Sequence, residues 1–124
     1  MPDELYKEII LDHHKNPRHF GTLKKPTHEA HLENTLCGDE VTMQLKVEGL
    51  KIKDVAFSGS GCAITTAAAS LLTDAVLGKS LAAVKKLGTK DIDKLLGVKV
   101  GPAREKCAYL GLETLQRALE KAKA

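Results

Sequence analysis

Two neighbouring apolar runs, joined by a short turn, set the first limit on how this chain can fold. In residues 41–47 the apolar side chains of Val41, Met43, Leu45 and Val47 alternate with polar ones, which is the period-two pattern of a half-buried strand. Glu48-Gly49 follows as a turn, and residues 51–57 form a second apolar run. A weaker run at residues 29–34 adds a third candidate strand. These runs predict a small antiparallel sheet of three strands.

Helical patterns occupy most of the remaining chain. After a Gly-Ser-rich loop at residues 58–61, apolar residues recur at helical spacing, and glycines follow several of the helical segments. The predicted helices cover residues 3–14, 62–77, 80–87, 89–95 and 102–121. Ser80 and Thr89 are expected as N-caps. Strands gathered first and helices after them indicate an α+β fold, a three-stranded sheet packed against about five helices, with residues 1–124 as a single domain.

Composition excludes several classes of protein. Aromatic residues make up 3% of the chain and the formal net charge is +3, which argues against the stacking platforms and basic stripes of nucleic-acid-binding proteins. No stretch approaches the roughly 18 uninterrupted apolar residues of a membrane span. The first residues lack the basic and then apolar order of a signal peptide. We therefore expect a cytoplasmic protein that binds neither nucleic acid nor membrane.

The three cysteines are the residues most suited to chemistry. Cys37 precedes Gly38-Asp39 at the entry to a predicted strand, Cys62 lies at a predicted helix start, and Cys107 lies in the first turns of the last helix. An odd number of thiols, in a chain large enough to fold without disulfides, points to free or metal-bound thiols. Because a helix N-terminus stabilises anions, Cys62 is a candidate low-pKa thiolate.

Spacing alone leaves the role of these cysteines open. They could be small buried hydrophobic residues, or three thiolates that join Asp39 to hold zinc or an iron–sulfur cluster. The intervals of 24 and 44 residues between them match no zinc knuckle or ferredoxin, and no CxxC occurs. A Cys/His nucleophilic pair also stays open, although the five histidines are more typical of exposed polar positions. No P-loop is present, because Lys-Ser/Thr does not follow the glycines at residues 58–61.

The motifs around the cysteines resemble a known family, the U-type iron–sulfur cluster assembly scaffolds (IscU, SufU and the N-terminal domain of NifU). The resemblance covers nearly the whole chain. It rests on NPRHFG at residues 16–21, NTLCGD at 34–39, FSGSGCAI at 57–64 and PAREKCA at 102–108. Three cysteines stand in matching contexts and in the same order. The implied fold is a SufE/NifU-like α+β domain whose cysteines converge at one exposed end.

The resemblance also implies a site and its partners. Cys37, Asp39, Cys62 and Cys107 would hold iron, a transient [2Fe-2S] cluster or Zn²⁺. Sulfur would arrive as persulfide from a pyridoxal-phosphate-dependent cysteine desulfurase, and the finished cluster would pass to apo iron–sulfur proteins. In this reading the protein is a scaffold and not an enzyme. A third reading, a structural zinc protein, fits less well, because structural zinc sites are usually closed by compact Cys/His pairs.

Departures from the family pattern keep a second function in view. Lys106 stands before the third cysteine, where Isc-branch scaffolds usually carry His. A lysine at this position looks like the Suf branch. It favours a zinc-dependent sulfurtransferase that accepts persulfide on Cys37. Lys106 would then be an accessory residue acting electrostatically, and a solvated surface lysine is the alternative. The insertion common in Suf-type chains between the second and third cysteines is missing, which favours the scaffold. The Leu-Pro-Pro-Val-Lys motif, by which Isc scaffolds are recognised by their chaperone, is absent too. Its absence argues against dependence on a dedicated Hsp70-type chaperone.

Overall fold

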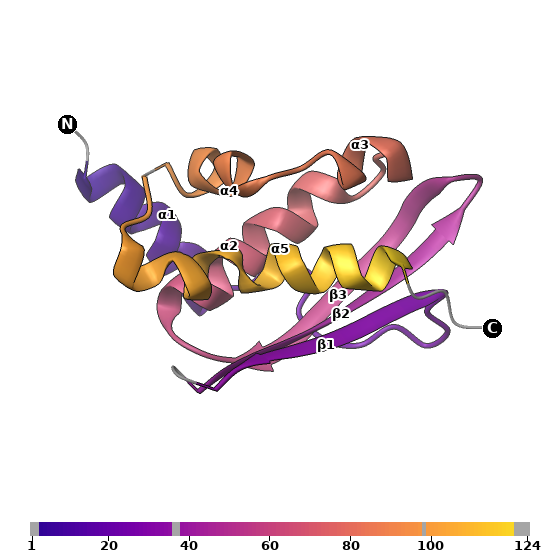
Figure 1. Cartoon of the computed structure of the whole chain (residues 1–124), viewed down its shortest axis with the longest axis horizontal. Coiled ribbons are helices and arrows are strands. Elements are labelled where there is room, and N and C mark those ends of the chain that lie inside the picture. Colours follow the sequence, from indigo (N-terminus) through magenta and orange to yellow (C-terminus); the bar gives the residue numbers. More distant parts are fainter. Residues whose placement is uncertain (1–2, 36–37, 98, 121–124) are drawn as a thin grey trace.

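The computed structural model describes residues 3–35, 38–97 and 99–120, which form three strands, five α-helices and one short 3-10 helix. One helix precedes the strands and the others follow them (Figure 1). The elements are α1 (Asp3–Lys15), β1 (His28–Asn34), β2 (Asp39–Glu48), β3 (Lys51–Ser60), α2 (Ala63–Val76), α3 (Leu81–Lys85), α4 (Thr89–Leu96), η1 (Pro102–Arg104) and α5 (Glu105–Glu120). The predicted α+β class and three-stranded sheet are confirmed.

The sheet is antiparallel throughout, with β2 between β1 and β3. A two-residue turn joins β2 to β3, and Gly49 and Leu50 both have positive φ there, at 59° and 64°. Positive φ at both central residues gives a turn whose twist matches that of the two strands. On β1, Asn34 pairs with Asp39, the first residue of β2. The end of β1 therefore lies beside the start of β2.

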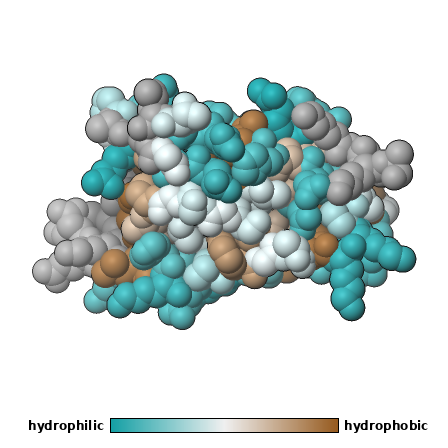
Figure 2. Space-filling view, turned by 90° about the horizontal axis from the view of Figure 1, so that it is seen from below, coloured by the Kyte–Doolittle hydropathy of each residue, from teal (hydrophilic) through white to brown (hydrophobic). Residues whose placement is uncertain are grey.

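The helices cover one face of the sheet (Figure 1). The segment between α1 and β1 lies against part of the other face, where the Leu23 backbone N–H donates a hydrogen bond to Gln44 Oε1. Met43 and Leu45 of β2 are fully buried on the covered face, whereas the alternate residues Thr42 and Gln44 are partly exposed. Figure 2 looks onto the molecule from the side of the sheet and shows mostly polar residues, with apolar ones in separate small patches. The core therefore lies between the sheet and the helical layer.

Helices α2 and α5 form the centre of that layer, and small residues let them approach closely. A Cβ added at Gly111 of α5 would lie 3.2 Å from the Cβ of Ala69 in α2. The buried residues of these two helices include Ala67, Ala68, Leu72, Val76, Ala108, Leu112 and Leu115. Burial of these side chains against the sheet fixes the two helix starts at the same end of the domain.

Helix α1 is attached to α2 through a buried polar contact. His13 Nδ1 lies 2.7 Å from Ser70 Oγ, which also accepts a 2.8 Å hydrogen bond from the Arg18 backbone N–H. Burial lowers the pKa of His13, and the nearby Arg18 guanidinium lowers it further. The hydrogen bond and the low pKa both favour a neutral imidazole at this junction. None of the helices described here is long and apolar enough to cross a bilayer.

Three boundaries differ from those expected. Strand β3 continues to Ser60, so the prediction of a loop at residues 58–61 was wrong for its first three residues. The ladder continues because Gly59, opposite Val41, lets the strands approach; a Cβ there would lie 2.1 Å from the Glu40 carbonyl oxygen. Gly88, not Thr89, is the N-cap of α4. The last helix opens with the 3-10 turn η1 before α5 begins.

Candidate metal centre

Three elements bring ligand-type side chains to one end of the domain. Asp39 is the first residue of β2, Cys62 is the N-cap of α2, and Cys107 lies in the first turn of α5. The carboxylate oxygen and the two Sγ atoms all lie within 4.8 Å of one another. Because metal–thiolate bonds are about 2.3 Å long, ligand atoms on one metal ion stand roughly 4 Å apart. The three side chains can therefore share a metal ion after a small closing movement.

Asp39 is held by donors from α2. Its side chain is 3% exposed, so its charge needs hydrogen bonds in place of water. Oδ1 accepts a 3.2 Å bond from the Cys62 backbone N–H, and Oδ2 accepts a 3.1 Å bond from the Thr65 hydroxyl. The carboxylate thus caps the start of α2 from the central strand, and the start of β2 and the start of α2 are fixed relative to each other.

The Cys62 thiol sits among donors at the same helix start. Burial raises its pKa, but the neighbouring Thr65 hydroxyl, the backbone amides of Thr65 and Ile64, and the Cys107 thiol together lower the pKa by more. The net result is a pKa below the usual value. Cys62 is half-buried and lies 3.4 Å (Sγ) from Thr65 Oγ1, and Cys107 is 7% exposed. Thiolates are the form that binds metal, so this environment favours ligation.

Gly61 keeps space open for this arrangement. A Cβ at that position would lie 2.6 Å from Asp39 Oδ1 and 3.1 Å from the Cβ of Thr65. Glycine therefore allows the carboxylate to approach the backbone just before Cys62. A hollow of about 290 Å³ lies on the other side of Asp39, lined by Glu33, Asn34, Thr35, Gly38, Asp39 and Glu40.

The structure brings together three of the four ligands expected from the sequence. The fourth, Cys37, lies outside the described residues. Lys106 is exposed beside Cys107. His13, considered as a partner for a nucleophilic cysteine, instead contacts Ser70.

Two polar residues at this end of the fold were not singled out from the sequence, Thr65 and Asn34. Thr65 contacts both Asp39 and Cys62, and the Asn34 amide nitrogen is buried without a hydrogen-bond partner. A hydroxyl three residues after a helix-start cysteine is a signal for Thr65. Asn34 is the first residue of the NTLCGD motif, but its place beside Asp39 depends on strand register.

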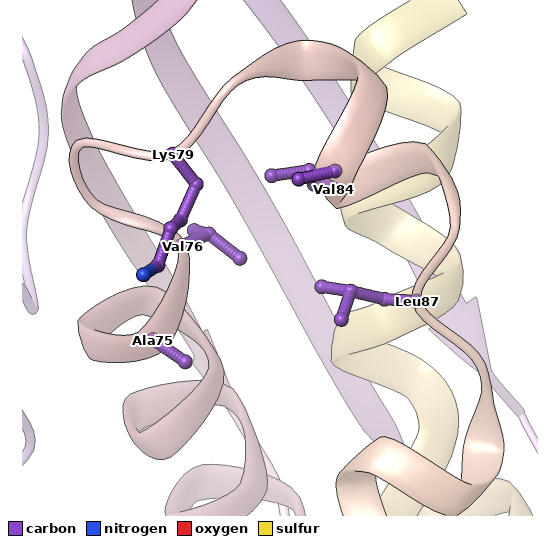
Figure 3. A pocket seen from close by; sticks show the side chains of 6 residues that line it. Ala75, Val76, Lys79, Val84 and Leu87 are labelled. Carbon is purple, nitrogen blue, oxygen red and sulfur yellow. The ribbon is translucent and has the colours of Figure 1, made fainter.

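A second hollow, of about 270 Å³, lies at the far end of α2 (Figure 3). The side chains that line it are apolar apart from Lys79, and none of them is a common metal ligand. They are Ala75, Val76, Lys79, Ala83, Val84 and Leu87. With 14 residues in α2, the two ends of that helix are about 20 Å apart. This hollow is separate from the candidate metal centre.

Residues 5–124 match the family described as the NifU-like N terminal domain. The chain belongs to this family. Among NifU-like relatives, the zinc-dependent sulfurtransferase SufU of Bacillus subtilis is 33% identical over 136 residues, covering 96% of this chain and 92% of SufU. The iron–sulfur cluster assembly scaffold protein IscU of Streptococcus pyogenes is 36% identical over 138 residues, covering 96% of this chain and 85% of that protein. The expected membership in the U-type scaffold family is confirmed.

The same fold is found in a solved structure. The crystal structure of the N-terminal part of a nitrogen-fixing NifU-like protein from Brucella abortus superimposes with a TM-score of 0.75, covering 95% of this chain and 94% of that one. At 23% identity this likeness concerns the fold alone. The alignments with SufU and with the streptococcal IscU are both longer than this 124-residue chain, so both relatives contain residues that have no counterpart here.

Proposed function

We propose that this protein is a scaffold on which a [2Fe-2S] cluster is assembled and from which it is passed to apo-proteins. The observation that carries the proposal is the convergence of Asp39, Cys62 and Cys107, with ligand atoms within 4.8 Å of one another. Two thiols and a carboxylate suit iron and zinc. Cys37 is proposed as the fourth ligand, since it is two residues from Asp39 in the sequence. The cluster is cargo in this account, and not a resident cofactor.

The chain's own groups prepare the site for loading. Thiols must lose their protons to bind iron, and the donors around Cys62 favour its thiolate. Asp39 already accepts two hydrogen bonds, so a metal ion has to compete with them for the carboxylate. We therefore expect Asp39 to be the weakest ligand and the one through which cargo is released. Cluster-transfer rates unchanged in Asp39→Ala would contradict this role.

Sulfur supply is proposed to come from a pyridoxal-phosphate-dependent cysteine desulfurase. The desulfurase persulfide would give its outer sulfur to a thiolate of this chain, and the desulfurase cysteine would leave as a thiolate. A half-buried low-pKa thiolate such as Cys62 is accessible to such an exchange. Cys37, the Suf-type acceptor position, is the other proposed acceptor.

A second candidate function, zinc-dependent sulfur transfer, is favoured by two observations. Lys106 precedes the third cysteine, and a relative at 33% identity carries the name of such a sulfurtransferase. In that case zinc is resident at Asp39, Cys62 and Cys107, and Cys37 accepts the persulfide. The experiment that tests the scaffold also separates it from this alternative.

The test is visible absorption during anaerobic incubation with ferrous iron, cysteine, a thiol reductant and a cysteine desulfurase, using protein of known zinc content. A scaffold develops sulfur-to-iron charge-transfer bands that are lost in Cys107→Ser and retained in Lys106→Ala. Retained zinc without such bands, together with faster desulfurase turnover, would refute the scaffold and establish the sulfurtransferase. Neither bands nor faster turnover would refute both.

A further inference from the structure

A buried hydrogen-bond donor without a partner lies next to the candidate metal centre. Among the described residues, Asn34 Nδ2 is the buried side-chain nitrogen or oxygen atom that lacks a hydrogen-bond partner. Buried donors are nearly always paired, because an unpaired one loses its bonds to water without replacement. The amide therefore calls for an acceptor that is present only under some conditions.

Strand register places Asn34 beside the metal ligands. Asn34 pairs directly with Asp39, and the pairs two and four residues along, Leu32 with Val41 and Ala30 with Met43, belong to the covered face of the sheet. Because side chains alternate between faces, Asn34 and Asp39 share that face. Directly opposed residues have Cβ atoms about 5 Å apart. Cys107 Sγ lies within 4.8 Å of the Asp39 carboxylate, and α5 packs against β1.

The acceptor that fits best is sulfur. Both oxygens of Asp39 already have donors, from the Cys62 amide and the Thr65 hydroxyl, so the carboxylate does not need a third. Loading the site converts cysteine thiols to thiolates and brings sulfide, so anionic sulfur is present only in the loaded state. Hydrogen bonds to these sulfurs are one of the means by which proteins tune iron–sulfur centres.

We propose that Asn34, through Nδ2, donates a hydrogen bond to an anionic sulfur of the loaded centre, either a cysteine thiolate or a sulfide brought with the cargo. This inference rests on the proposed function. It makes Asn34 a positioning residue that stabilises the loaded state and not the empty one. Removing the donor should therefore affect the two states in opposite ways, which a purely structural role would not do.

The first variant is Asn34→Leu, which keeps a similar shape and removes the donor. In the empty protein it should leave the melting temperature unchanged or raise it, because an unpaired buried donor has been removed. In the loaded protein it should lower metal affinity by roughly 10- to 100-fold, the usual effect of losing a partner of a metal ligand. Asn34→Asp, which puts acceptors in place of the donor, should weaken binding at least as much. Asn16→Leu, the same change at an exposed asparagine, is the matched control.

Binding is measured with cobalt(II), whose sulfur-to-metal charge-transfer band reports directly on thiolate ligands, and then with the reconstituted cluster. A weaker and shifted cobalt band in Asn34→Leu identifies a thiolate acceptor. An unchanged cobalt band with a less stable cluster identifies sulfide. Cobalt and cluster binding both equal to the control would overturn the inference, as would an effect that disappears in the Asp39→Asn background, where it would belong to the carboxylate. Wild-type protein that binds no cobalt through Cys62 and Cys107 would overturn the proposed function as well.

Discussion

Substitution of Gly61 by alanine perturbs the candidate metal centre through volume alone. The Gly61 backbone does not have positive φ, so alanine adds no conformational strain. The new Cβ would lie 2.6 Å from Asp39 Oδ1, and an ordinary contact requires a retreat of roughly 0.8 Å. Because the Cys62 amide is next to Gly61, the same movement lengthens its 3.2 Å hydrogen bond to the carboxylate. One added methyl group thus loosens Asp39 from the start of α2.

Overpacking of this kind costs about 1–3 kcal/mol of the free energy of unfolding, which in a chain of this size lowers the melting temperature by roughly 4–12 °C. Displacement of a ligand should also reduce zinc affinity about tenfold or more. Thermal unfolding with chelator present measures the first effect, and chelator competition measures the second.

The matched control is Gly101→Ala, which lies shortly before Cys107. A Cβ at Gly101 meets no heavy atom within 4 Å, and φ there is −76°. Stability should therefore be unchanged or higher by about 0.4–1 kcal/mol. If Gly61→Ala melts and binds zinc as Gly101→Ala does, the carboxylate is not held against the backbone in the way described.

Three further changes test other contacts. Thr65→Val removes the hydroxyl donor to the buried Asp39 carboxylate and should cost about 1.5–3 kcal/mol in urea unfolding, whereas Thr65→Ser should restore most of it; equal stability of the two variants would contradict the bond. Burial lowers the pKa of His13, so the unfolded chain binds more protons and stability should fall as pH drops below 6.5, with a smaller loss in His13→Gln; identical pH profiles would refute this. Burial and a neighbouring carboxylate in α4 raise the pKa of Tyr109 to about 12, so Tyr109→Phe should remove the highest tyrosinate transition and cost about 1 kcal/mol; a transition that persists would belong to another residue.

The sheet was predictable from the sequence because local patterns specify it. Alternation in residues 41–47 and the turn after Glu48 are signals within a few neighbouring residues, and they led to the correct hairpin. The extent of β3 was not predictable in the same way. Glycine and serine at residues 58–60 have low strand propensity, and the strand continues only because β2 lies close enough to pair with Gly59. Tertiary pairing overrides local preference there.

For the metal centre, the sequence offered ligand types and not their surroundings. Asp39, Cys62 and Cys107 stood out by chemistry and by resemblance to the U-type scaffolds. Thr65 did not stand out, because a threonine inside a helix is usually unrelated to a site, and only the approach of β2 gives it a carboxylate to bind. Asn34 depends on register across the sheet, which periodicity alone does not fix at a strand end.

Because the ligands come from three separate elements, a bound cargo also affects the stability of the fold. A metal ion held by β2, α2 and α5 is a cross-link between segments that are otherwise joined by packing and by hydrogen bonds, two of them to Asp39. Binding to the folded chain alone adds about 2.7 kcal/mol of stability when the free ligand is at 100 times its dissociation constant. Under the proposed function, release of the cluster therefore lowers the folding stability of this protein. The empty protein unfolds locally more often than the loaded protein. Susceptibility to proteolysis therefore distinguishes the empty form from the loaded form in a cell.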